Sequence, residues 1–156
     1  MTDDRRHTLT GWVFVGAQVV LLALIVLLPG RGDWPVPTWL QVLGFGLVVA
    51  GLVVLGASAR SLGSALTATP EPRAGARLQT SGLYARVRHP IYSGVLLVVV
   101  GLVARSGSWV VLAVGTVTCG FFTVKAAWEE RRLAVRYAEY RDYAARTGRF
   151  VPRLRR

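Results

Sequence analysis

The chain has 156 residues, of which 53% are hydrophobic, yet it carries a formal net charge of +11. This composition excludes a disordered chain, which needs low hydrophobicity, and a disulfide scaffold, because Cys119 is the only cysteine. The isoelectric point near 11.3 would suit a nucleic-acid-binding protein. The apolar residues are gathered into long runs, however, and this favours a membrane protein without a nucleic-acid partner.

The apolar residues form four runs along the chain, at residues 11–28, 39–57, 91–104 and 107–124. Eighteen residues of helix reach about 27 Å, close to the hydrocarbon thickness of a bilayer, about 30 Å. The third run is shorter, but Pro90 suits the first turn of a helix and can begin it. We therefore expect an all-α, polytopic membrane protein with four transmembrane helices, in which spans three and four form a helical hairpin.

The basic residues indicate an orientation in the membrane. Of the 19 Lys and Arg, 17 precede the first run, lie between the second and third, or follow the fourth. The positive-inside rule then places both termini in the cytoplasm, and we expect a multi-pass protein of a bacterial-type plasma membrane that contacts anionic lipids. Apolar spacing after the fourth run predicts that this span continues as a cytoplasmic amphipathic helix to about Arg146, ending at Gly148.

A first cluster of candidate functional residues lies just before the third run, over residues 82–94. Pro90 restricts His89 to an extended conformation and opens a helix whose free N–H groups point to the interface. A helix start flanked by Arg88 and His89 favours a carboxylate or a phosphate. The simpler alternative is that the arginines anchor the span at the head groups while Tyr92 joins an interfacial aromatic belt.

A second cluster is the pair Glu129 and Glu130, directly after the fourth run. Ionised carboxylates near a membrane are costly, so they need partners such as Arg86, Arg88 or Arg132, or a bound ligand. An interfacial helix explains the arginines of the tail, but it does not explain why two glutamates lie closest to the membrane.

Other catalytic patterns are not visible in the sequence. His7 and His89 are far apart and Cys119 lies inside a span, so we expect no metal site. There is no Ser-His-Asp spacing and no Gly-rich phosphate loop. The chemistry is therefore expected to need neither a metal nor a covalent nucleophile.

Together the two clusters resemble the signature of the integral-membrane methyltransferases that include isoprenylcysteine carboxyl methyltransferase and the phospholipid N-methyltransferases. The resemblance covers residues 82–153, and the matching residues are Gly82, Tyr84, Val87, Arg88, His89, Pro90, Tyr92, Gly94, Glu129, Glu130, Leu133, Tyr137, Glu139, Tyr140, Tyr143, Arg149, Phe150, Val151, Pro152 and Arg153. The length and the apolar runs predict one membrane domain over 1–156 with an N-terminal helix pair at 1–58, and the resemblance implies that residues 82–153 form its cofactor-binding catalytic half.

The resemblance also implies S-adenosylmethionine as the methyl donor, bound at the cytoplasmic end of the hairpin and covered by the tail. The helix start suits the cofactor's carboxylate, a glutamate suits its ammonium or ribose diol, and a tyrosine suits its adenine or sulfonium. The residues to which the cofactor role is carried over are Leu83, Tyr84, His89, Pro90, Tyr92, Gly94, Glu129, Glu130 and Tyr140.

For the methyl acceptor we expect a lipid, an isoprenoid or another hydrophobic molecule that enters from the bilayer between the second span and the hairpin. Arg88 or Arg153 would orient a carboxylate or phosphate of the acceptor, and Glu129 would act as base if the acceptor is an amine. The sequence leaves a carboxylate, an amine and a thiol open as the acceptor group. The competing hypothesis is a non-catalytic membrane subunit or lipid-binding module that retains the fold.

Overall fold

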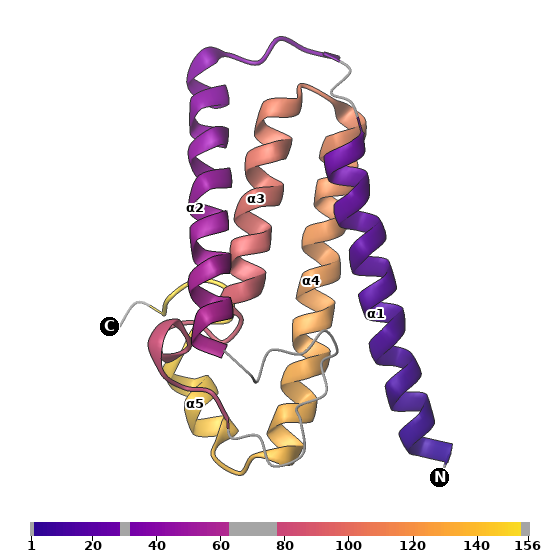
Figure 1. The fold of residues 1–156 in the computed structure, drawn as a ribbon, viewed down its shortest axis with the longest axis vertical. Coiled ribbons are helices and arrows are strands. Elements are labelled where there is room, and N and C mark those ends of the chain that lie inside the picture. The colour runs from indigo at the N-terminus through magenta and orange to yellow at the C-terminus, as the bar shows by residue number, and fades with distance from the viewer. Residues whose placement is uncertain (1, 29–31, 63–77, 154–156) are drawn as a thin grey trace.

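The computed structural model describes residues 2–28, 32–62 and 78–153, with the backbone alone for residues 2–8, and part of the predicted cytoplasmic loop, residues 63–77, lies outside them. Within these ranges every regular element is a helix, which confirms the all-α class for the described part of the chain (Figure 1). The elements are α1 (Thr2–Leu27), α2 (Thr38–Leu62), the 3₁₀ helix η2 (Gly82–Ala85), α3 (Pro90–Ser106), α4 (Trp109–Arg136) and α5 (Tyr140–Arg146).

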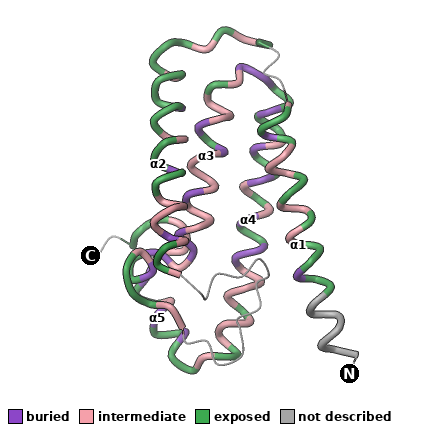
Figure 2. Tube along the Cα trace, in the orientation of Figure 1, coloured by how far each residue is buried: buried purple, intermediate pink, exposed green. Residues whose placement is uncertain are grey.

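Three of these helices are long and apolar enough to cross a membrane: α1 from Leu9 onward, α2 and α4. Large hydrophobic side chains such as Val13, Val42 and Phe45 are exposed on them, and Figure 2 shows long exposed stretches along α2. Such exposure fits helices surrounded by lipid. Helix α3 is apolar but has 17 residues, about 25 Å, so a fourth span and the orientation stay predictions.

The long helices contact one another in the order α2, α3, α4 and α1, and α1 diverges from α4 toward the N-terminus (Figure 1). The turn between α3 and α4 consists of Gly107, at a φ of 56°, and Ser108. The loop between α1 and α2 contacts this turn: the Trp34 N–H donates to the Gly107 carbonyl (3.3 Å), and the Trp109 N–H donates to the Asp33 carboxylate (2.8 Å).

Helices α2 and α3 pack through glycines with their backbones in contact. A Cβ on Gly51 would lie 2.6 Å from the carbonyl oxygen of Gly94, and a Cβ on Gly101 would lie 2.5 Å from that of Gly44. Small residues allow this close approach of membrane helices. The backbones of the two helices therefore touch along these glycines, and the expected route of the acceptor between the second span and the hairpin stays a prediction.

The end of α4 also differs from the expectation of one continuous helix to Arg146. Helix α4 ends at Arg136, Tyr137 is extended (φ −119°, ψ 115°), and a separate short helix, α5, begins at Tyr140. The break turns the chain back toward the start of α3, where Tyr140 and Tyr143 become buried. Burial of these two aromatic side chains stabilises the bent chain, whereas a straight extension of α4 would leave them in solvent.

Candidate functional site

The site begins where two extended segments lie side by side, residues 86–89 before α3 and residues 148–150 after α5. Val87 and Gly148 form a parallel bridge, in which the N–H of Arg88 donates to the Gly148 carbonyl (2.8 Å). The hydroxyl of Ser93, in the first turn of α3, donates to the Phe150 carbonyl (2.6 Å). The C-terminal segment is thereby fixed across the start of α3.

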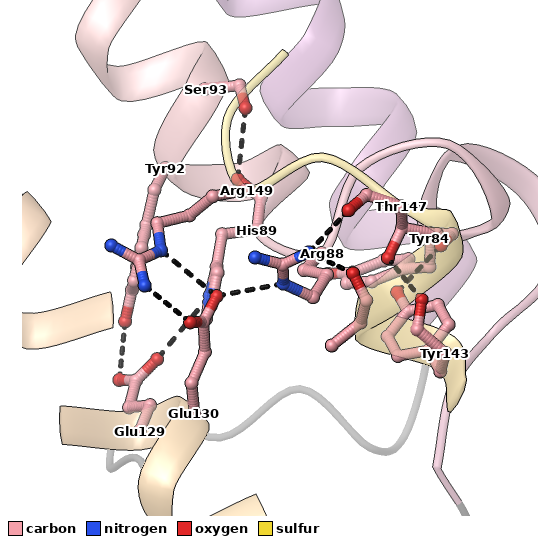
Figure 3. Close-up of polar contacts among 11 residues, drawn as sticks. Tyr84, Arg88, His89, Tyr92, Ser93, Glu129, Glu130, Tyr143, Thr147 and Arg149 are labelled. Carbon is pink, nitrogen blue, oxygen red and sulfur yellow. Dashed lines mark hydrogen bonds and ion pairs between the residues drawn. The ribbon is translucent and has the colours of Figure 1, made fainter. Parts of the chain in front are cut away.

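Glu130, near the end of α4, holds these segments together (Figure 3). Its carboxylate accepts hydrogen bonds from Arg88 Nε (2.9 Å) and from Arg149 Nε (3.1 Å) and Nη2 (2.6 Å). Arg88 also donates through Nη1 to the carbonyls of Ala144 (2.9 Å) and Thr147. The hydrogen bonds to Glu130 raise the pKa of the Arg149 guanidinium further above its usual range. Both oxygens of Glu130 are therefore engaged by the protein itself.

Glu129 directly precedes Glu130 in the sequence, but its carboxylate contacts different residues. One of its oxygens accepts a hydrogen bond from the Tyr92 hydroxyl (2.6 Å). The other lies 3.7 Å from Nδ1 of His89, beyond hydrogen-bond length. The His89 ring stacks on the Tyr92 ring, with centroids 5.2 Å apart and planes 3° apart. Glu129 thus keeps an oxygen that can accept hydrogen bonds from a ligand.

Two buried polar atoms of the site have no hydrogen-bond partner within the described part of the chain: Nε2 of His89 and the hydroxyl of Tyr140. Nε2 approaches Glu130 Oε1 to 3.3 Å, but without the geometry of a hydrogen bond. The Tyr140 side chain is only 4% exposed. Buried polar atoms are nearly always paired, so both atoms indicate a place for a ligand.

The tyrosines around this cluster are neutral near pH 7. Burial raises the pKa of Tyr84 and of Tyr143 to about 12, and it also raises the pKa of Tyr140. The Tyr143 hydroxyl donates to the Tyr84 carbonyl (2.7 Å), which links α5 to η2. These hydroxyl groups can donate hydrogen bonds, but they are poor bases.

The structure brings together most of the residues expected from the sequence, namely Tyr84, Arg88, His89, Pro90, Tyr92, Glu129, Glu130 and Tyr140. Three others lie apart. Gly94 faces Gly51 of α2, Leu83 is half-buried in η2, and the exposed Arg153 donates to the Ala145 carbonyl (2.5 Å) on α5. Their roles toward a cofactor or an acceptor stay predictions.

The sequence reasoning missed two charged residues. Arg149, the bidentate partner of Glu130, belongs to the matching motif, and the need of two interfacial glutamates for cationic partners was the signal that could have identified it. Lys125 is buried on α4, where its ammonium donates to Gln18 of α1 (2.6 Å). The signal there was a lysine one helical turn before Glu129, at the end of an apolar run.

Two curated proteins are similar in sequence to this chain. The cobalt-zinc-cadmium resistance protein CzcN of Cupriavidus metallidurans is 34% identical over 151 residues, which are 96% of this chain and 65% of that protein. The nickel-cobalt-cadmium resistance protein NccN of Alcaligenes xylosoxydans xylosoxydans is 31% identical over 151 residues, 96% of this chain and 66% of that protein. The chain thus spans slightly less than two thirds of the length of these relatives. The sequence model of the phospholipid methyltransferase family matches residues 39–140, so the chain belongs to that family.

Proposed function

We propose that the protein transfers a methyl group from S-adenosylmethionine to a hydrophobic acceptor at the cytoplasmic face of a bacterial plasma membrane. Family membership supports the reaction class. The observation that supports the cofactor site is that two buried atoms, His89 Nε2 and the Tyr140 hydroxyl, make no hydrogen bond in the described part of the chain, in a cluster with the two glutamates. The basic residues of the predicted cytoplasmic segments support the orientation.

The donors and acceptors of this cluster fit S-adenosylmethionine. The Tyr140 hydroxyl and His89 Nε2 suit its carboxylate or ribose oxygens, and the second oxygen of Glu129 suits its ammonium or ribose diol. The His89–Tyr92 stack offers an aromatic face for adenine or for the sulfonium. When bound, the cofactor supplies an electrophilic methyl group.

Arg88 and Glu130 then have a different role from the one expected from the sequence. Arg88 donates to Glu130 and to two backbone carbonyls, and Glu130 accepts from Arg88 and Arg149. We assign both to positioning, because they hold the start of α3, the end of α4 and the C-terminal segment in one arrangement. Methyl transfer depends mainly on orientation and exclusion of water, so positioning contributes directly to the rate.

For the acceptor, Glu129 is the group that would remove a proton if the acceptor is an amine. Its carboxylate is held by the Tyr92 hydroxyl, in a site whose inner wall includes the fully buried Phe122 against the Tyr92 ring (5.0 Å). Arg153 follows α5, is exposed, and donates to the Ala145 carbonyl on that helix. It would therefore contact only a part of the acceptor that lies outside the cluster around Glu129. The alternative remains a non-catalytic membrane subunit or lipid-binding module.

Calorimetry on the purified protein in nanodiscs tests the cofactor site with S-adenosylhomocysteine as the probe. We expect binding by the wild type and at least tenfold weaker binding, about 1.4 kcal/mol, for His89→Ala and Glu129→Gln. Glu139→Gln is the matched control, since this exposed carboxylate lies outside the cluster, and its affinity should equal that of the wild type. Unchanged affinity in both site variants would remove this site assignment.

Methyl transfer itself is tested with methyl-labelled S-adenosylmethionine and a native membrane extract. We expect label in a chloroform-soluble product with the wild type and none with Glu129→Gln. Binding of S-adenosylhomocysteine without any labelled lipid, hydrophobic metabolite or protein would support the non-catalytic alternative instead.

A further inference from the structure

Lys125 is a buried cation on the apolar side of the candidate site. Its side chain is 3% exposed, its ammonium donates to Gln18 Oε1 (2.6 Å), and Nζ lies 5.2 Å from the centroid of the Tyr92 ring. An ammonium has three N–H donors, and Gln18 is its one hydrogen-bond acceptor among the residues that the structure describes. A charge within a membrane-spanning helix is costly unless it is paired. Glu129, one turn along α4, attracts this charge but accepts no hydrogen bond from it, so two of the N–H donors are left for a ligand.

The position of Lys125 relates it to the proposed methyl-transfer site. Lys125 and Glu129 are one turn apart on α4 and therefore share a helix face. Tyr92 links the two, because its ring faces the Lys125 ammonium and its hydroxyl donates to Glu129. A molecule bound to the ammonium would lie beside Tyr92, on the side that leads along α4 toward the middle of the membrane.

Helix α1 covers this position with aromatic and amide side chains. Phe14 packs against Phe121 (5.8 Å between centroids) and Trp128 (5.2 Å), and Gln18 follows Phe14 by one turn. This contact differs from the seam between α2 and α3, where the backbones touch at Gly51. Near Lys125, α1 contacts α4 through these aromatic contacts and one hydrogen bond. Ile25, two turns beyond Gln18, instead packs into the core with Val99 and Val111. An amphiphile can therefore reach Lys125 from the bilayer where the N-terminal half of α1 moves away from α4.

We propose that Lys125, together with Gln18, binds the anionic head group of an amphiphile that enters from the bilayer between α1 and α4. The ligand group is a carboxylate or a phosphate, because either accepts charge-assisted hydrogen bonds from an ammonium and neutralises its charge. A protonated amine would be repelled there. This binding site does not depend on the proposed methyl transfer, because it is argued from Lys125, Gln18 and Tyr92 alone.

Spin-labelled lipids in phosphatidylcholine vesicles test this site. We expect spin-labelled stearate or phosphatidic acid to associate with the wild type roughly threefold more strongly than spin-labelled phosphatidylcholine, the size of one partly hydrated ion pair. Whichever of the two anionic lipids is preferred identifies the group as carboxylate or phosphate. Lys125→Gln should abolish the preference, because glutamine keeps a donor for Gln18 but removes the charge.

The control is Arg60→Met, which removes an exposed charge at the end of α2, away from α1 and α4, and should keep the preference. If Lys125→Gln does not fold, Lys125→Arg provides the second measurement, since it keeps the charge and should keep the preference. The proposal is overturned if the wild type shows no preference, if Lys125→Gln retains it, or if Lys125→Arg loses it while folded. Binding of S-adenosylhomocysteine, measured on the same wild-type preparation, reports separately on the proposed function.

Discussion

Glu130 accepts two hydrogen bonds from Arg149, at 3.1 Å from Nε and 2.6 Å from Nη2, and so ties the end of α4 to the segment that follows α5. Bidentate pairs of this kind are stronger and more directional than single ion pairs. The adjacent Glu129 instead pairs with the Tyr92 hydroxyl and keeps an oxygen for a ligand. Two glutamates that look equivalent in the sequence therefore differ: both oxygens of Glu130 bind arginines, whereas one oxygen of Glu129 lies 3.7 Å from Nδ1 of His89, beyond hydrogen-bond length.

Glu130→Gln should weaken the attachment of the C-terminal segment to α3 and α4. The amide carries no charge for Arg88 and Arg149, and the loss of a partly buried charge-assisted pair costs about 1.5–3 kcal/mol. We expect faster proteolysis after Arg146 and a lower unfolding temperature in detergent. Glu139→Gln, an exposed carboxylate before α5, should change neither, and equal effects of the two substitutions would contradict this role of Glu130.

Arg149→Ala and Arg153→Ala should differ although both arginines belong to the matching motif. Arg149 makes the bidentate pair with Glu130, whereas the exposed Arg153 donates to one backbone carbonyl on α5. Arg149→Ala is expected to destabilise the protein by about 1–3 kcal/mol and Arg153→Ala by less than about 0.5 kcal/mol. Thermal unfolding of the two variants side by side measures the difference, and the reverse order would show that the pair is not what holds the segment.

Gly51→Val should disrupt the seam between α2 and α3. A Cβ at this position meets the Gly94 carbonyl oxygen at 2.6 Å, and that backbone atom cannot move aside as a flexible side chain would. We expect a loss of about 1–3 kcal/mol, as for other overpacked positions, in detergent unfolding. Gly46→Val is the matched control on the same helix, because no atom lies within 4 Å of its Cβ position.

Tyr143→Phe removes the hydrogen bond to the Tyr84 carbonyl and should cost about 0.5–1.5 kcal/mol at pH 8. Tyr140→Phe should be nearly neutral in the ligand-free protein, since its hydroxyl has no partner in the described part of the chain. Burial raises the pKa of Tyr143 to about 12 from an ordinary value near 10. The folded protein thus favours the neutral phenol. The resulting contribution of Tyr143 to the free energy of unfolding is fully present below about pH 10 and is lost as the pH rises toward 12.

The same relation gives a pH dependence that can be measured. Unfolding midpoints followed from pH 8 to 12 should fall more steeply for the wild type than for Tyr143→Phe, because the variant has one fewer group to ionise on unfolding. A constant difference between the two proteins over this range would contradict the buried, hydrogen-bonded phenol.

The sequence predicted those features that depend on local pattern. The apolar runs correspond to α1, α2, α3 and α4, and Pro90 begins α3 because its fixed φ suits a first helical turn. The break at Tyr137 escaped prediction, because the helical spacing of apolar residues continues through it. The bend depends on burying Tyr140 and Tyr143 against segments about 60 residues earlier in the chain.

The same limit applies to the candidate site. His89, Tyr92 and Glu129 could be selected because a proline, an aromatic residue and carboxylates at a membrane boundary are locally unusual. Arg88 was expected both to orient the acceptor and to be a partner of the glutamates; its hydrogen bond to Glu130 agrees with the second expectation, whereas its bonds to the carbonyls of Ala144 and Thr147 depend on contacts more than 50 residues away in the chain. The contact of Lys125 with Gln18 could not be predicted, because it depends on the packing of α1 against α4, more than 100 residues apart in the chain.

The glycine seam has a consequence for the depth of the site in the bilayer. Helix α3 has 17 residues and α2 has 25, and contact of their backbones prevents either helix from sliding past the other. When the thickness of the surrounding bilayer changes, the two helices must therefore tilt as one body. His89, at the first turn of α3, follows that tilt. The thickness of the membrane thereby sets which atoms of a lipid would lie level with the proposed methyl-transfer site.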